Sequence, residues 1–250
     1  MFAFWVQLFC FFLIILPRIN LTLSENLKVC KRTHPNLNEC FRDAVQDALP
    51  KIKDGISKLH FLPIEPFEIA SMSIAAGHSA VQVVQNYNNL KLYELSKSVV
   101  NSAKLEHTED GFKAEIDVTI PLVRAEANYH VDGKLLMLPI AGDGKCTLIF
   151  KESKAVINMI GHKIEKKGKT YLEIIDLKVE FVPKDADFHY DNLFNGDKAL
   201  GDSMNTLINE NWKELFDEIR PGFEEIFSKL FKNAANSIFT KVPGEDIFPL

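Results

Sequence analysis

The longest regular pattern in the chain covers residues 195–239, where apolar positions return every three or four residues, as one face of an α-helix requires. These positions are Leu200, Met204, Leu207, Ile208, Trp212, Leu215, Phe216, Ile219, Phe223, Ile226, Phe227, Leu230, Phe231, Ala234 and Ile238. At ~1.5 Å per residue, a single helix over this range would reach roughly 60 Å. So long an apolar stripe needs an equally long partner.

Between residues 67 and 181 the apolar period changes from helical to two, which is typical of strands. The clearest segment is 112–122, where apolar residues at even positions alternate with charged or polar ones, so one face is buried and the other is wet. After Pro121 the apolar positions become odd, from Val123 to Val131. This phase change predicts a β-bulge that bends the sheet.

The remaining strands and turns follow from the same alternation and from turn residues. We expect strands at 135–140, 146–150, 155–161 and 171–181, and turns at 132–133, 142–144 and 166–169. Asn195-Gly196 predicts one more turn, after which Asp197 would cap the long helix.

A first helix is predicted over residues 36–60, capped by Asn38 and kinked by Pro50. The order is therefore a helix, many strands and a long helix, which is the α+β class. The chain offers mainly antiparallel strands to cover the long helix, so we expect a strongly curved sheet wrapped lengthwise around it. Such a wrap can leave a long apolar channel.

The first residues form a separate segment. Residues 2–16 are almost purely apolar and end at Pro17 and Arg18, which is short for a membrane anchor and fits a secretory signal peptide. We predict cleavage after Ser24 and a secreted, extracellular protein of residues 25–250, organised as a single domain; two domains and an uncleaved anchor are the alternatives.

Charge excludes one class of partner. The formal net charge is −5 and becomes −6 when Arg18, the only charged residue before position 25, is removed. An acidic chain with no basic run is a poor nucleic-acid binder. The 19 phenylalanines suit both a core and a lipid pocket.

Three cysteines remain after residue 24. Cys30 and Cys40 lie close together in a chain expected to be extracellular, so we predict a disulfide between them, worth roughly 2–3 kcal/mol. Cys146 would then be unpaired, and a buried inert thiol is favoured over a reactive or intermolecular one. No zinc-binding pattern completes a metal site.

Five segments together resemble one family. They are CKRTHPNLNEC at 30–40, LPIEPFEI at 62–69, LPIAGDGK at 138–145, LFNGDKALGDSMNTLINENWKELFDEIRP at 193–221 and VPGEDIFP at 242–249. This combination resembles the takeout and haemolymph juvenile hormone-binding protein family of insects, and the unpaired Cys146 resembles its takeout-like branch. The resemblance implies a secreted carrier with a TULIP-like super-roll fold, whose curved sheet wraps a long helix around a tunnel for apolar ligands.

The predicted ligand-binding residues are the inward-facing positions of the strands and of the long helix, although for any one of them an ordinary core position is the better interpretation. They are Ile116, Val118, Ile120, Leu122, Tyr129, Leu148, Phe150, Ile157, Met159, Ile175, Leu177, Val179, Phe181, Phe223, Phe227 and Phe231. Tyr129 and Tyr87 are candidate hydroxyl contacts for a polar ligand group, and Tyr129 could equally bond to backbone in a dry core.

No catalytic pattern is present in the sequence, and we expect neither an enzyme nor a cofactor. The seven histidines form no HExxH or metal-ligand pair. The expected partner is a hydrophobic small molecule such as a terpenoid or fatty acid, without stable membrane insertion. Two alternatives remain: a protein with a filled core that acts on a receptor or partner through its surface, and an enzyme on lipid esters whose triad is hidden in sequence.

Overall fold

The computed structural model describes residues 27–77 and 79–250. The predicted signal peptide and its cleavage site lie outside these residues. The helices are α2 (Leu37–Lys51), α3 (Lys198–Glu210), α4 (Trp212–Phe239) and α5 (Gly244–Ile247), with 3-10 turns η2 (Ser57–Leu59), η3 (Leu95–Lys97) and η4 (Phe194–Gly196). The strands are β1 (Phe67–Ile74), β2 (Val81–Tyr93), β3 (Val99–Thr108), β4 (Gly111–Leu135), β5 (Leu138–Lys166), β6 (Lys169–Val182) and β7 (Asp185–Tyr190).

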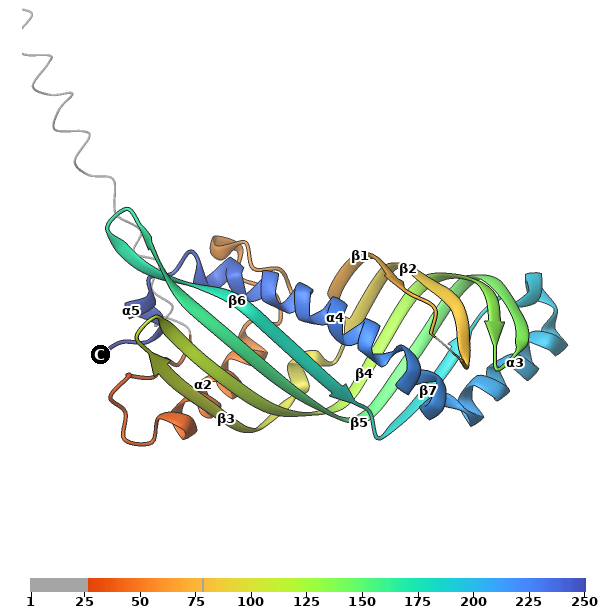
Figure 1. Cartoon of the computed structure of the whole chain (residues 1–250), viewed down its shortest axis with the longest axis horizontal. Coiled ribbons are helices and arrows are strands. Elements are labelled where there is room, and N and C mark those ends of the chain that lie inside the picture. Colours follow the sequence, from red (N-terminus) through yellow and green to blue (C-terminus); the bar gives the residue numbers. More distant parts are fainter. Residues whose placement is uncertain (1–26, 78) are drawn as a thin grey trace, which may run out of the picture.

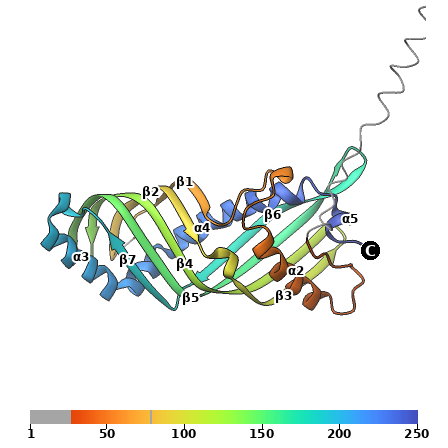
Figure 2. The ribbon, with the colours of Figure 1, turned by 180° about the vertical axis from the view of Figure 1, so that it is seen from behind.

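Two long strands organise the sheet. β4 has 25 residues and β5 has 29, and they pair with each other along the whole length of β4, from Gly111 opposite His162 to Leu135 opposite Leu138. Each also pairs with two shorter strands, one per half: β4 with β3 and β2, and β5 with β6 and β7. All pairs are antiparallel, and the main strand order is β1-β2-β4-β5-β6. The expected curved sheet around a long helix is confirmed, because the sheet curls around α4 (Figures 1 and 2).

The molecule is elongated, with α3 and β7 at one end and α2 and α5 at the other (Figure 1). The core lies between the concave face of the sheet and the apolar stripe of α4. α2 covers β3, with the Asn38 Oδ1 accepting a hydrogen bond from the Leu105 amide at 2.9 Å. The prediction that Asn38 caps this helix is therefore wrong: α2 begins at Leu37, and the Asn38 side chain fastens the helix to the sheet.

Both predicted long helices are shorter than expected. α2 ends at Lys51, directly after Pro50, and does not continue to residue 60. The C-terminal helix is interrupted at Asn211, whose φ of −114° and ψ of 16° leave the helical region and separate α3 from α4. The 28 residues of α4 still span ~42 Å. The predicted cap is confirmed, since the Asp197 carboxylate accepts a hydrogen bond from the Leu200 amide at 3.1 Å.

The predicted phase change at Pro121 is present, but it is not a bulge between the two long strands. Ile120 pairs with Ser153 and Leu122 pairs with Lys151, so the register is the same on both sides. Glu152, which faces Pro121, has a left-handed φ of 44°. The buried positions change parity in β4 and in β5 at this same point. The two strands therefore turn over together, and each presents an apolar face to the core in both halves of the molecule.

Two predicted turns are wrong because their glycines serve a different purpose. Residues 132–133 and 142–144 lie inside β4 and β5, and the hairpin turns instead at Leu136 and Met137, with φ of 47° and 69°. A Cβ on Gly133 would lie 2.5 Å from the Gln82 carbonyl oxygen, and one on Gly142 would lie 2.6 Å from the Tyr129 hydroxyl. The absence of a side chain lets the β2 backbone approach Gly133 and lets the Tyr129 ring approach Gly142. The predicted turn at 166–169 is confirmed, with left-handed Lys167 and Gly168.

Candidate ligand-binding cavity

A cavity of about 340 Å³ lies between the concave face of the sheet and α4. Its walls come from α2, from strands β1 to β6 and from α4, and they are almost entirely apolar. Among the described residues that line it, only Tyr87, Ser98, Arg220 and Glu224 carry polar side-chain groups. An apolar cavity with few polar groups is the usual form of a small-molecule site.

Most of the predicted ligand-binding residues line this cavity. They are Ile116, Val118, Ile120, Leu148, Phe150, Ile157, Met159, Leu177, Val179, Phe181, Phe223, Phe227 and Phe231. The strand residues reach it by simple alternation, and the helix residues reach it because steps of four keep them on one face of α4. Whether each contacts a ligand stays a prediction.

Three predicted residues lie elsewhere. Leu122 is 37% exposed because the turnover at Pro121 puts Val123, not Leu122, on the inner face. Ile175 is 41% exposed. It is the extra residue of a bulge, since Ile160 pairs with Asp176 while Gly161 pairs with Ile174. The buried residues of β6 are therefore even-numbered before the bulge, within 172–174, and odd-numbered after it, within 177–179.

Tyr129 is buried but does not line the large cavity. Its hydroxyl donates a hydrogen bond to the Asp191 carbonyl oxygen at 2.5 Å, and its ring meets the Tyr190 ring edge-on at 4.9 Å between centroids. Burial raises the pKa of Tyr129 to about 12. The backbone-bonded alternative for this hydroxyl is therefore correct. Tyr87, the other candidate, does line the cavity.

Sequence reasoning missed one end of the cavity. Val45, Leu49 and Ile52 from α2 and its exit, with Phe61 and Ile64 from the following segment, close this end. The helical period of α2 was the available signal, because it marks an apolar face, but the period alone does not say what that face covers. Contact with β3 directs this face toward the cavity.

Phenylalanine rings form a continuous line along one wall. On α4 the ring centroids are separated by 5.8 Å for Phe216–Phe223, 6.3 Å for Phe223–Phe227 and 5.8 Å for Phe227–Phe231. Phe67 on β1 continues the line at 5.5 Å from Phe231. Aromatic pairs at these separations add stability beyond area burial, so the wall is both apolar and well ordered.

The charged groups at the cavity belong to α4. The Glu224 Oε1 accepts a hydrogen bond from the Phe181 amide at 2.9 Å and lies 3.8 Å from the Arg220 Nη1. The Arg220 Nε lies 3.6 Å from the Asp217 Oδ1 and makes no hydrogen bond among the described residues. The guanidinium is thus held between two carboxylates, and its charge is compensated without a ligand.

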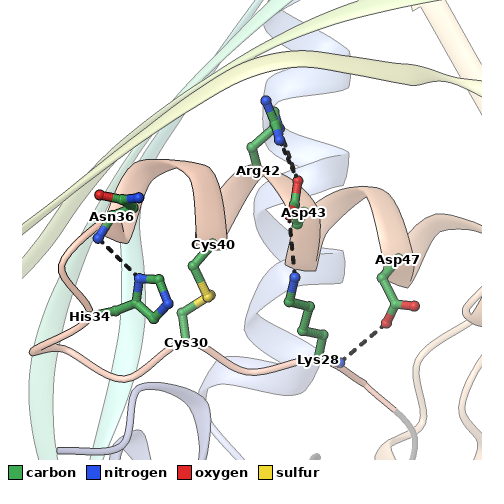
Figure 3. Close-up of a disulfide and its surroundings, with 8 residues drawn as sticks. All are labelled: Lys28, Cys30, His34, Asn36, Cys40, Arg42, Asp43 and Asp47. Carbon is green, nitrogen blue, oxygen red and sulfur yellow. Dashed lines mark hydrogen bonds and ion pairs between the residues drawn. A yellow bond between two sulfur atoms is a disulfide. The ribbon is translucent and has the colours of Figure 1, made fainter.

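The disulfide predicted between Cys30 and Cys40 is confirmed, with the two Cα atoms 5.9 Å apart. It ties the segment before α2 to the helix itself, and Lys28 adds an ion pair with Asp43 at 3.4 Å (Figure 3). Because α2 closes one end of the cavity, this crosslink helps to hold that end in place.

The buried Cys146 fits the inert interpretation. Its side chain is 3% exposed, and burial raises its pKa to about 12, so the nucleophilic thiolate is scarce at neutral pH. Within residues 27–77 and 79–250, no group of three or more His, Cys, Asp or Glu side chains is placed to hold a metal ion. No helix in this part of the chain is long and apolar enough to cross a membrane.

The fold and the cavity together define a class of protein in which a curved antiparallel sheet wraps a long helix around an apolar interior. The sequence matches the family model "Haemolymph juvenile hormone binding protein (JHBP)" over residues 8–249, and the chain belongs to this family.

Named relatives and a solved structure agree with this assignment. The chain is 28% identical over 228 residues to the "Circadian clock-controlled protein daywake" of Drosophila melanogaster, covering 89% of this chain and 86% of the relative. The same figures hold for daywake of Drosophila yakuba. The structure is similar to the crystal structure of Epiphyas postvittana Takeout 1, with a TM-score of 0.77 and 26% identity over 90% of this chain and 100% of that one. The predicted takeout and juvenile hormone-binding protein family is confirmed.

Proposed function

We propose that this protein is a secreted carrier that encloses a hydrophobic small molecule, such as a terpenoid or a fatty acid, between the sheet and α4. The observation that carries the proposal is the apolar cavity of about 340 Å³, lined by residues of nearly every strand. The family description, which names juvenile hormone binding, supports the same class of ligand.

Binding would be driven by desolvation and would need no covalent step. At ~25 cal/mol per Å², burying about 300 Å² of apolar ligand surface would contribute roughly 7 kcal/mol, before the cost of association is subtracted. The walls are preformed by strand pairing and by the ring contacts along α4, so little ordering would be required when a ligand enters. The cavity argues against the alternative of a protein with a filled core that acts on a receptor or partner through its surface.

Secretion is supported by the apolar N-terminal segment and by the disulfide, which is typical of oxidising compartments. Expression of the full chain in insect cells tests it, because the mature protein should appear in the medium with Glu25 as its first residue. Retention of the intact N-terminus in a membrane fraction would instead support an anchor.

Native mass spectrometry of the secreted protein, followed by solvent extraction, tests the carrier function. We expect either a stoichiometric bound lipid or uptake of a fluorescent fatty acid by the extracted protein. Val118→Trp puts an indole into the cavity and should reduce uptake, whereas Val84→Trp on the outer face of β2 should not. A protein that carries nothing and takes up nothing contradicts the proposal, and equal uptake by both variants would mean that binding occurs elsewhere.

A further inference from the structure

A second, smaller cavity of about 60 Å³ lies beside the large one, toward the α3 end of the molecule. It is lined by β2, β4, β5, β7, α3 and the first half of α4. A water molecule needs roughly 10–15 Å³ by this kind of measure, so the space fits a small functional group.

Aromatic rings separate the two cavities. Phe150, Phe216 and Phe223 line both of them, and the ring of Phe216 lies 5.4 Å from Phe150 and 5.8 Å from Phe223 between centroids. Tyr87 also lines both cavities. The smaller cavity is therefore a continuation of the apolar interior behind a wall of side chains.

The smaller cavity contains a buried polar group that the alternation of β2 does not predict. Gln85 occupies an inner position between Val83 and Tyr87 and is only 7% exposed. The Tyr87 hydroxyl donates a hydrogen bond to the Gln85 Oε1 at 2.7 Å and lies 3.2 Å from the Tyr190 hydroxyl. Burying an amide is costly unless its polar atoms are bonded.

The amide nitrogen of this group is unused as a donor. Among the described residues the Gln85 Nε2 donates no hydrogen bond, while its Oε1 is occupied by Tyr87. A primary amide carries two N–H donors on this nitrogen. An oxygen acceptor that enters the smaller cavity would therefore find a donor already in place.

The smaller cavity is also electrically neutral. Its described lining residues include no Lys, Arg, His, Asp or Glu. Burial raises the pKa of Tyr87 and of Tyr190 above the usual range, so both hydroxyls stay protonated at physiological pH. A carboxylate here would lose its hydration without gaining a counter-charge, which is strongly unfavourable. An uncharged oxygen would meet no such penalty.

We propose that Gln85, Tyr87 and Tyr190 form a polar subsite for the uncharged oxygen-bearing group of a lipid, such as a ketone, ester or aldehyde, whose hydrocarbon chain occupies the larger cavity. This inference rests on the carrier function proposed above and narrows it. The ligand reaches the subsite past Phe216, and the hydroxyl of Tyr87 lies at the boundary. The hydrogen bond to the subsite distinguishes a lipid with an uncharged oxygen group from one without it. Burial of the hydrocarbon chain in the larger cavity supplies most of the affinity.

The test compares three ligands with the same number of carbons: an alkane, a methyl ketone and a fatty acid. Their affinities are measured by displacement of a fluorescent probe. We expect the wild-type protein to prefer the ketone to the alkane by about tenfold, as one buried hydrogen bond implies, and to bind the ketone more tightly than the fatty acid. Gln85→Leu should abolish the preference for the ketone over the alkane.

Gln82→Leu is the matched control, because Gln82 lies on the outer face of the same strand and its side chain bonds only to the Ser79 carbonyl oxygen among the described residues. It should retain the preference. Tyr190→Phe removes one oxygen at constant shape and should weaken the preference partially, which keeps the test valid if Gln85→Leu does not fold.

The outcomes separate the two proposals. If Gln85→Leu and Tyr190→Phe bind both uncharged ligands as the wild type does, or if the fatty acid binds best, the subsite is wrong while the carrier function stands. If the wild-type protein binds none of the three ligands, both proposals fail.

Discussion

Asn209 on α3 bonds to both backbone groups of Phe188 on β7: its Oδ1 accepts a hydrogen bond from the Phe188 amide at 2.8 Å, and its Nδ2 donates one to the Phe188 carbonyl oxygen at 2.7 Å. Asn205 makes the same pair of bonds with Tyr190, and Asn236 on α4 makes it with Ile174 on β6. Among the described residues, β6 and β7 each pair with β5 on one side only. On their other side, these side-chain amides make the backbone hydrogen bonds that a neighbouring strand would otherwise make. Unpaired edges are liable to associate with other chains, and these asparagines protect them.

Replacing Asn209 by Leu removes both bonds and leaves the edge groups of Phe188 without these partners. We expect the free energy of unfolding to fall by about 2–4 kcal/mol and amide exchange in β7 to accelerate, measured by denaturant titration and by hydrogen–deuterium exchange. Asn88→Ala, at an exposed position of β2, is the control and should change stability little. Equal stability of Asn209→Leu and wild type would mean that the edge is not protected by this side chain.

Phe216→Ala should join the two cavities. The ring is 3% exposed and contacts Phe150, Phe181 and Phe223, so its removal should lower the free energy of unfolding by about 3–5 kcal/mol. The enlarged interior should shift the preference of the protein toward longer ligands in the displacement assay. Leu200→Ala, at an exposed position of α3, should alter neither property. An unchanged chain-length preference would show that Phe216 does not limit the accessible space.

Cys146 should make stability fall at alkaline pH. Its pKa rises from 9.0 to about 12 in the folded protein, so the unfolded chain releases the proton first and the folded state retains it. The stabilising contribution is complete below pH 9 and is lost as pH rises toward 12, with a slope of at most about 1.4 kcal/mol per pH unit. Unfolding of Cys146→Ala should depend less on pH than that of the wild type near pH 9, one unit below the usual tyrosine pKa of 10.0, where ionisation of Tyr87, Tyr129 and Tyr190 in the unfolded chain also begins to contribute. Rapid labelling of the native thiol at pH 8 would contradict this burial.

The Cys30–Cys40 crosslink should stabilise the α2 end of the molecule. Its loop is short, with a sequence separation of 10, so replacing both cysteines by Ser should cost roughly 2–3 kcal/mol. Ligand release should also become faster, because α2 supplies Val45 and Leu49 to the cavity. Denaturant unfolding and stopped-flow probe release measure the two effects. Reductant should reproduce the loss in the wild type, and the double variant should be insensitive to it.

The sequence predicts the parts of this fold that depend on local periodicity. Alternation in 112–122 identified Ile116, Val118 and Ile120 as cavity residues, and the helical period identified Phe223, Phe227 and Phe231. The family, the disulfide and the Asp197 cap also follow from residues that are adjacent or clearly spaced in sequence.

The errors arise where the neighbours of a residue come from distant parts of the chain. Gly133 and Gly142 resemble turn residues, but a strand and a tyrosine approach them closely. Ile175 continues an apolar run, yet the register of β5 against β6 places it outside. Asn205 and Asn209 resemble ordinary polar positions on a helix, because their partners on β7 are visible only after folding.

The joint turnover of β4 and β5 at Pro121 and Glu152 restricts how this chain can evolve. A deletion of one residue in either strand near this point would carry half of that strand's apolar side chains to the outer surface. A second one-residue deletion at the opposite position of the partner strand would return the apolar side chains of both strands to the inner face. Length changes in the middle of these two strands should therefore occur in pairs across related sequences, whereas those at the Leu136–Met137 tip can occur singly.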